Sequence, residues 1–183
     1  IITSDKCYEN VEWLWGYREN DRLGGKDPYS ASKACAELIT KVYMESFFKE
    51  KGPNIATTRA GNVIGGGDWA LDRVVPDCVR AWSKGEKVEI RNPNATRPWQ
   101  HVLEPLSGYL ALGQKLFQGN PELKNQSFNF GPQAKVNQSV GDLITEMAQH
   151  WPGAEWKFEQ EMNSDKPEST LLKLNCDKAL QLL

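Results

Sequence analysis

Short apolar runs alternate with longer segments of helical periodicity along nearly the whole chain, and this alternation restricts the fold more than any other feature. Glycine, proline and asparagine mark many of the boundaries. The runs predict strands and the periodic segments predict helices. Strands are expected at residues 1–3, 55–59, 88–90, 99–102, 127–130 and 156–158, and helices at residues 30–49, 73–84, 104–117 and 140–150. Such alternation is typical of an α/β fold.

The chain opens on two isoleucines, followed by the polar run Thr-Ser-Asp-Lys at residues 3–6. An apolar run that ends in polar residues is typical of a buried strand reaching the edge of its sheet. In doubly wound sheets, binding sites lie at these carboxyl ends. We therefore expect residues 1–3 to finish a strand that begins before this sequence, and Ser4, Asp5 and Lys6 to line a site.

Tyr29 and Lys33 form a Tyr-x-x-x-Lys pattern at the start of the first long helix. Residues four apart lie on the same face of a helix. A tyrosine hydroxyl has a pKa of about 10 in isolation, and a nearby ammonium lowers that pKa by stabilising the phenolate. The pair therefore predicts a hydroxyl that takes a proton from an alcohol. Ser4 is expected to hydrogen-bond the same alcohol.

These residues, with their surroundings, resemble the CDP-glucose 4,6-dehydratase family of the short-chain dehydrogenase/reductase superfamily. The likeness runs from T-S-D-K-C-Y-E-N through W-G-Y-R-E-N-D-x-L-G-G-x-D-P-Y-S-x-S-K to T-x-R-A-G-N-V-I-G-G-G-D-W. It continues through D-R-V-V-P-D and R-P-W-Q-H-V-L-E-P, and more loosely through N-F-G-P and K-P-E-x-x-x-L-K-L. It therefore covers nearly the whole chain.

The resemblance implies a lyase that uses NAD in an internal redox cycle on CDP-glucose. Hydride leaves carbon 4 of the glucosyl group, water is eliminated across carbons 5 and 6, and hydride returns to carbon 6. In this scheme Tyr29 is the base at the 4-hydroxyl and Ser4 orients that oxygen. Lys33 tunes Tyr29, and the two residues hold the nicotinamide ribose. The product would enter deoxysugar biosynthesis for bacterial lipopolysaccharide or a related surface polysaccharide.

Asp5 and Lys6 are implied to manage the elimination. One would deliver a proton to the departing 6-hydroxyl and the other would assist proton removal at carbon 5, and the sequence does not assign which does which. The related dTDP-glucose dehydratases carry Asp-Glu at this point. Lys6 in place of glutamate favours the CDP-sugar group, although a lysine must lose its proton before it acts as a base.

Other motifs of the resemblance predict contacts with the nucleotide-sugar. Asn62 is expected to donate to the pyrophosphate. Arg73 and Arg97 are the candidate phosphate ligands, because a diphosphate suits planar, bidentate cations. Trp99 or Trp69 would pack on the cytosine or the sugar. A further candidate segment is Lys-Pro-Glu at residues 166–168.

The predicted organisation is the C-terminal part of a Rossmann-type parallel sheet in residues 1–60, and a smaller α/β substrate-binding domain in residues 61–183, with an interleaved boundary. Gly65, Gly66 and Gly67 do not form a dinucleotide fingerprint, because the acidic Asp68 follows and would repel a pyrophosphate. We therefore expect the N-terminal NAD-binding half to be missing, and the chain alone to be inactive.

Composition excludes several other functions. A net charge of −2 gives no electrostatic reason to expect nucleic acid or an anionic membrane as a partner. No apolar run approaches the roughly 20 residues that span a bilayer. Two separate histidines and four scattered cysteines predict no metal site, and free thiols in the cytoplasm.

Two other functions remain open from the sequence. One is another nucleotide-sugar dehydratase or epimerase of the same superfamily, acting on a dTDP- or GDP-sugar. The other is a non-catalytic nucleotide-sugar-binding piece. By analogy with the family, the protein is expected to be a homo-oligomer, a dimer or tetramer, with the long helix after Tyr29 as its dimer-forming face.

Overall fold

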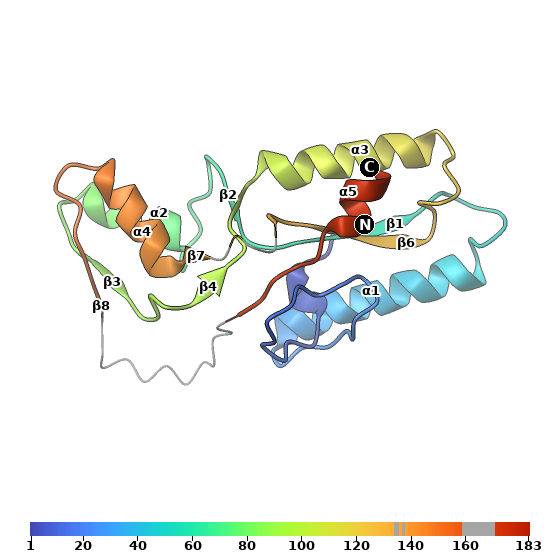
Figure 1. Cartoon of the computed structure of the whole chain (residues 1–183), viewed down its shortest axis with the longest axis horizontal. Helices are drawn as coiled ribbons and strands as arrows, with labels where there is room; N and C mark the ends of the chain where they lie inside the picture. The colour runs from blue at the N-terminus through green and yellow to red at the C-terminus, as the bar shows by residue number, and fades with distance from the viewer. Residues whose placement is uncertain (134–135, 137, 159–170) are drawn as a thin grey trace.

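The computed structural model describes residues 1–133, 136, 138–158 and 171–183, and its elements fall into two groups along the longest axis of the molecule (Figure 1). One group holds the chain termini and both long helices. The other is built from two shorter helices and short strands. The α/β fold class is therefore confirmed. Among the described residues, no helix is both long and apolar enough to cross a membrane.

The first group is organised by a parallel sheet. Strand β1 (Ala56–Ala60) pairs in parallel with β6 (Gln126–Phe130), and Ile2 bridges to Thr58 on the other side of β1, also in parallel. Three parallel segments thus lie in the order Ile2, β1, β6. Parallel sheets are covered on both faces. Helix α1 (Pro28–Ser46) lies on one side of this sheet, and α3 (Leu103–Phe117) lies on the other (Figure 1).

The side of the sheet that faces α3 has an apolar core. Phe128 and Leu123 are fully buried there, together with Leu112 of α3. The last helix, α5 (Asp177–Leu182), adds Ala179 to the same cluster. The sequence analysis did not predict α5, because six residues are too few for helical periodicity to stand out.

The second group has its own core. Strand β3 (Val88–Ile90) pairs in parallel with β8 (Trp156–Phe158), and helices α2 (Val74–Trp82) and α4 (Val140–Gln149) pack against them. Cys78 and Ile144 are completely buried in this cluster. Ser139 caps α4 in a reciprocal capping box with Asp142.

Two further strand pairs lie between these groups. Strand β2 (Val63–Ile64) pairs in parallel with β5 (Gln100–His101), and β4 (Thr96–Arg97) pairs antiparallel with β7 (Gln138–Ser139). Because α3 and β6 come after residue 60 and still belong to the first group, the chain crosses between the groups more than once. The expected domain boundary near residue 60 stays a prediction.

Helix α1 begins and buries its faces for identifiable reasons. Asp27 caps it by accepting a hydrogen bond from the Ser30 N–H, and Pro28 occupies its first position. The apolar spacing that predicts the helix does not mark its buried face. Ser30, Ala34, Glu37, Thr40 and Met44 are buried, whereas the face formed by Leu38, Ile39, Val42 and Tyr43 is exposed.

The polar character of that buried face is explained by an ion pair. The Glu37 carboxylate of α1 lies 2.7 Å from the guanidinium of Arg59 on β1, and both side chains are at most 3% exposed. Thr57 also donates to this carboxylate, at 2.7 Å. Burial alone would raise the pKa of Glu37, but the hydrogen bond and charge of Arg59 and the bonds from Thr3 and Thr57 hold it below its ordinary value.

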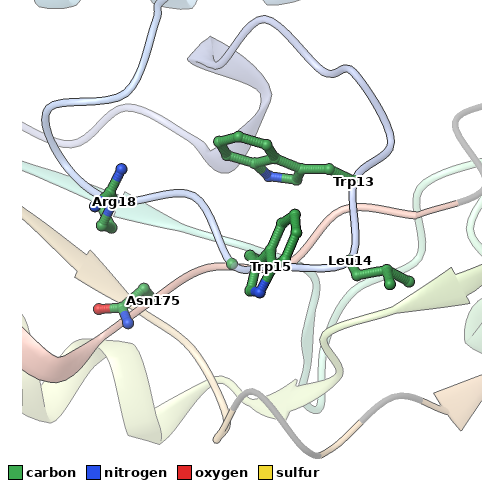
Figure 2. A pocket seen from close by; sticks show the side chains of 6 residues that line it. Trp13, Leu14, Trp15, Arg18 and Asn175 are labelled. Carbon is green, nitrogen blue, oxygen red and sulfur yellow. The ribbon is translucent and has the colours of Figure 1, made fainter.

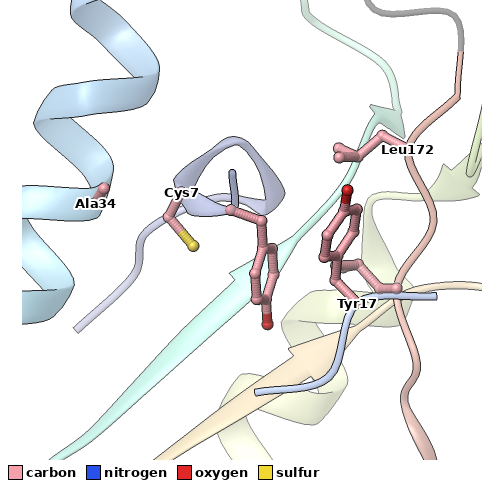
Figure 3. Close-up of a cluster of buried hydrophobic side chains, with 6 residues drawn as sticks. Cys7, Tyr17, Ala34 and Leu172 are labelled. Atoms are coloured by element: carbon pink, nitrogen blue, oxygen red, sulfur yellow. The ribbon is translucent and has the colours of Figure 1, made fainter. Parts of the chain in front are cut away.

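A third cluster joins α1 to the loops that follow the first strand. Cys7, from the short 3-10 helix η1 (Asp5–Cys7), and Ala34 of α1 are buried in it together with Tyr17 and Leu172 (Figure 3). Burial raises the pKa of the Cys7 thiol to about 12, so this cysteine is an uncharged packing residue. The start of α1 is thereby fixed against the chain that carries Ser4, Asp5 and Lys6.

The ion pair predicts a large difference between two glutamates of the same helix. Glu37→Ala leaves Arg59 buried without its partner, which should lower the free energy of unfolding by about 3–5 kcal/mol. Glu45→Ala is the matched control, because Glu45 pairs with Lys41 at 3.8 Å on the surface. That loss should be about 0.5 kcal/mol or less. Urea unfolding of both variants measures the difference, and equal losses would contradict it.

Candidate active site

The turn that carries Ser4, Asp5 and Lys6 is the 3-10 helix η1, located where the first parallel segment ends. Ser4 is its N-cap, and the Ser4 Oγ accepts a hydrogen bond from the Lys6 N–H at 3.2 Å. The same hydroxyl donates to Asp5 Oδ1 at 2.9 Å. The turn therefore places two of the predicted catalytic side chains in direct contact, and it lies at the strand end where the sequence predicts a site.

Asp5 is a buried carboxyl group with one free oxygen. It is 3% exposed, and its Oδ2 has no hydrogen-bond partner among the described residues. Burial raises the pKa of Asp5 above its ordinary value, against the opposing charges of Lys6 and Arg97 and the hydrogen bond from Ser4. A carboxyl group in this environment keeps its proton to higher pH than an exposed one. It is therefore suited to deliver a proton.

Tyr29 and Lys33 lie in the first turns of α1 and are accessible. The Tyr29 side chain is 55% exposed, and the Lys33 ammonium lies 5.6 Å from the centre of its ring. This is the neighbourhood that the Tyr-x-x-x-Lys spacing predicts.

The start of α1 and the catalytic turn approach each other. Cys7 of the turn and Ala34 of α1 share one buried cluster. Asp27, the N-cap of α1, has a pKa below its ordinary value, mainly because Ser30 donates to it, and the Lys6 ammonium contributes to the same effect. The structure thus brings the turn and the N-terminal end of α1 together at one end of the sheet.

Three of the predicted substrate-binding residues come from segments that adjoin Asp5. A Cβ atom built on Gly61 would lie 3.3 Å from Asp5 Oδ2 and 2.8 Å from Pro98 Cγ, so the ends of β1 and β4 meet at this carboxyl group. Asn62 and Trp99 are the next residues of these two segments, and the Asn62 carbonyl accepts from the Gln100 N–H at 3.2 Å. Arg97 is buried, and its charge acts on Asp5.

The other two residues, Trp69 and Arg73, lie in the exposed segment before α2. Trp69 is 61% exposed, and Arg73 is the N-cap residue of α2. Arg80 holds this segment on the helix by donating to the Trp69 and Ala70 carbonyls, at 2.8 and 3.2 Å. The Lys-Pro-Glu candidate at residues 166–168 lies outside the described residues.

A hollow of about 450 Å³ lies apart from the predicted site residues. Its walls are formed by Trp13, Leu14, Trp15, Gly16, Arg18 and Asn175 (Figure 2). The two tryptophan rings meet edge to face, with centroids 6.0 Å apart. The only sequence signal for it is the high tryptophan content of a polar segment. The residues that line the hollow include neither the turn nor Tyr29.

The described residues fit one end of NAD. Tyr29 and Lys33 present a hydroxyl and an ammonium on an exposed helical turn, which suits a ribose and its adjoining ring. The glycine run at residues 65–67 is a weaker candidate for binding the pyrophosphate of NAD. Gly66 and Gly67 have open space around them, but Asp68 follows them and is exposed. Within the described part of the chain, this run does not have the form of a pyrophosphate turn.

Comparison with known proteins identifies several relatives. The model of the NAD dependent epimerase/dehydratase family matches residues 2–131. The chain is 47% identical to a CDP-glucose 4,6-dehydratase of Salmonella typhimurium over 97% of its length. The structure superposes on dTDP-glucose 4,6-dehydratase from Bacillus anthracis in complex with NAD, with a TM-score of 0.73, 19% identity and 98% of this chain covered.

A second solved structure is UDP-glucuronic acid 4-epimerase from Bacillus cereus, in complex with UDP-glucuronic acid and NAD. Its TM-score is 0.81 at 19% identity, and all of this chain is covered. The chain spans about half the length of these proteins: 50% of the Salmonella protein, 53% of the Bacillus anthracis chain and 54% of the Bacillus cereus chain. At this identity the two solved structures establish the fold.

The raised pKa of Asp5 predicts a pH effect with a definite sign. Below the ordinary value of 3.8, Asp5 is protonated in both the folded and the unfolded protein. As the pH rises from there through the higher folded pKa, the unfolded state loses its proton first. The free energy of unfolding of the wild type should therefore fall relative to that of Asp5→Asn. Urea titrations of both proteins across this range measure the difference, and a relative gain would contradict the assignment.

Proposed function

The chain belongs to the NAD dependent epimerase/dehydratase family, and on that basis we propose that it carries the catalytic and sugar-binding portion of a CDP-glucose 4,6-dehydratase. The observation that carries the proposal is the buried Asp5 with its raised pKa, next to Lys6 and beside the start of α1. An epimerase needs only a redox centre. An elimination also needs an acid for the departing hydroxyl, and a buried carboxyl that retains its proton supplies one.

In the proposed mechanism Tyr29 takes the proton from the 4-hydroxyl of the glucosyl group. Ser4 orients that oxygen through its hydroxyl, which already donates to Asp5. Lys33 is proposed to assist Tyr29 from its place one helical turn away, where its ammonium lies 5.6 Å from the centre of the Tyr29 ring. Because Tyr29 is exposed at the start of α1, substrate can reach it without a rearrangement of the core.

Oxidation at carbon 4 makes the proton at carbon 5 acidic, so water can leave across carbons 5 and 6. We propose that Asp5 delivers its proton to the departing 6-hydroxyl, since burial favours its neutral form. Lys6 then assists removal of the carbon 5 proton. It is partly buried at the edge of the turn. The proton that Asp5 gives up leaves with the water. The proton taken from carbon 5 is held by the base and returns to carbon 5 at the end of the cycle, and the proton that Tyr29 took from the 4-hydroxyl restores Asp5.

NAD, when bound, accepts the hydride from carbon 4 and returns it to carbon 6, and Tyr29 and Lys33 are the residues that would hold its ribose. Asn62, Arg73 and Arg97 are proposed for the pyrophosphate of the substrate, and Trp69 or Trp99 for its cytosine or sugar. The proximity of Gly61, Pro98 and Asp5 supports the placement of Asn62 and Trp99 near the reacting sugar. We place the reaction in the cytoplasm, which suits the four free cysteines.

Another nucleotide-sugar enzyme of the family is the alternative. The solved structures with this fold include a dTDP-glucose dehydratase and a UDP-sugar epimerase. Turnover of CDP-glucose by the whole protein, in competition with dTDP- and GDP-glucose, separates these possibilities. Release of a 4-keto-6-deoxy sugar identifies dehydration, whereas an epimerase returns a hexose. Binding of CDP-glucose without turnover would support a non-catalytic nucleotide-sugar-binding protein.

Removal of the phenolic hydroxyl tests the redox step. In the whole protein, Tyr29→Phe should lower kcat for CDP-glucose by roughly 10²–10⁴-fold, the usual contribution of a positioned acid or base. Substrate binding should change little, because the ring remains. Tyr43→Phe is the matched control, since Tyr43 is an exposed tyrosine of the same helix. Near-normal turnover of Tyr29→Phe would show that its hydroxyl has no catalytic role.

The exposed apolar face of α1 is proposed as the contact between subunits of a homo-oligomer. Leu38, Ile39, Val42 and Tyr43 border a hollow of about 240 Å³ on that face. A charge placed there should oppose association, so Val42→Glu should shift the whole protein toward monomer in light scattering. Lys41→Glu is the control, as Lys41 is exposed on the same helix outside the hollow. If both variants keep the wild-type mass, the interface lies elsewhere.

A further inference from the structure

We propose that the buried pair of Glu37 and Arg59 is a positioning device for the active site, which holds the catalytic turn of residues 4–7 at both of its ends against helix α1. The inference rests on the proposed function, because it concerns the same site. It assigns a role to two residues outside the predicted set of site residues.

The N-terminal end of the turn is held by the glutamate. The Thr3 hydroxyl donates to Glu37 Oε1 at 2.5 Å, and it also lies 3.2 Å from the Thr58 carbonyl. The Thr3 N–H donates to that same carbonyl at 2.8 Å. Thr3 is 9% exposed and directly precedes Ser4. The position of the Ser4 backbone therefore depends on a bond to the carboxylate.

The C-terminal end of the turn is held by the arginine. Arg59 Nη1 donates to the Tyr8 hydroxyl at 2.7 Å, and the guanidinium lies over the Tyr8 ring, 4.9 Å from its centre. The Tyr8 hydroxyl in turn donates to Asn129 Oδ1 at 2.8 Å. Tyr8 follows Cys7, the last residue of the turn, and is 2% exposed. Both residues that flank the turn are thus bonded to one ion pair.

The same ion pair also fixes the position of Tyr29 and Lys33, the part of the proposed site that lies on α1. Glu37 lies one helical turn beyond Lys33 and two beyond Tyr29 on α1. An α-helix is rigid over two turns. The carboxylate that holds Thr3 therefore also fixes the position of Tyr29. Displacement of about 1 Å between reacting groups can cost roughly 10²-fold in rate. A shared anchor for the two halves therefore bears on the rate of the reaction as well as on stability.

Ser127 supplies a matched comparison within the same network. Its hydroxyl accepts from Arg59 Nη2 at 3.1 Å and donates to Glu37 Oε2 at 3.4 Å, and it lies 2.8 Å from the Thr57 hydroxyl. It approaches the ion pair from β6, and it has no bond to the turn among the described residues. Removing it takes a hydrogen bond from each member of the pair, whereas removal of the Thr3 hydroxyl takes one from Glu37 alone. Only the latter frees an end of the turn.

The experiment compares Thr3→Val, Thr3→Ser, Tyr8→Phe and Ser127→Ala in the whole protein with CDP-glucose as substrate. Thr3→Val and Tyr8→Phe should lower kcat by roughly tenfold or more, with KM within about twofold of the wild type. Thr3→Ser, which keeps the hydroxyl, should restore kcat, and Ser127→Ala should leave it near the wild-type value. A loss of kcat of the same size in Ser127→Ala and Thr3→Val would overturn the proposal.

Backbone amide exchange on the same variants gives a readout that needs no activity. Thr3→Val and Tyr8→Phe should speed exchange of the amides of residues 5–8, and Ser127→Ala should not. Unchanged exchange there would overturn the proposal, even if kcat fell. If the wild type does not convert CDP-glucose, the proposed function fails, and the exchange result alone decides whether the ion pair holds the turn.

Discussion

The buried pair of Glu37 and Arg59 is the interaction on which the rest of this structure depends. It joins a helix to a strand inside the protein, where neither charge can be left without a partner. A buried ion pair contributes little net stability compared with apolar residues of similar size, because both charges must leave water. What the ion pair contributes instead is a fixed orientation of the helix relative to the strand. Hydrogen bonds to fixed lone pairs fix the orientation of the bonded segments, whereas apolar contacts allow them to slide.

Burial acts in the same direction on Glu37 and Asp5, raising the pKa of both carboxyl groups, but their hydrogen-bond partners give opposite net shifts. Glu37 is buried with an arginine and two threonines as donors, and its pKa falls below the ordinary value. Asp5 is buried with one free oxygen, and its pKa rises. The environment of each group therefore favours the ionised form of Glu37 and the neutral form of Asp5, and the neutral form is the one that the proposed role of Asp5 as a proton donor needs. Two carboxyl groups with opposite shifts are the pattern by which acid and base roles are assigned in active sites.

Local patterns predicted some parts of this arrangement well. The sequence predicts the proximity of Tyr29 and Lys33 and the break after the first strand, because both depend only on neighbouring residues. Glu37 was not predicted, because a glutamate within an amphipathic helix normally indicates the solvated face. Its burial depends on Arg59, 22 residues away, and a single sequence gives no sign of that pairing. Helix α5 was missed because it is one short segment held by tertiary packing.

The catalytic turn also depends on a close approach from the second half of the fold. Any side chain at Gly61 would meet Pro98 Cγ at 2.8 Å, so only glycine allows the end of β1 to pass this close to the β4–β5 connection. The same position would place a Cβ 3.3 Å from Asp5 Oδ2. Water is thereby excluded from the side of Asp5 that faces these segments. The burial that raises the pKa of Asp5 thus involves Gly61 after β1, and Gly61 also meets Pro98 after β4. Asn62 and Trp99, the next residues along these two segments, are the ones proposed to bind substrate, so the proposed contacts would lie near Asp5.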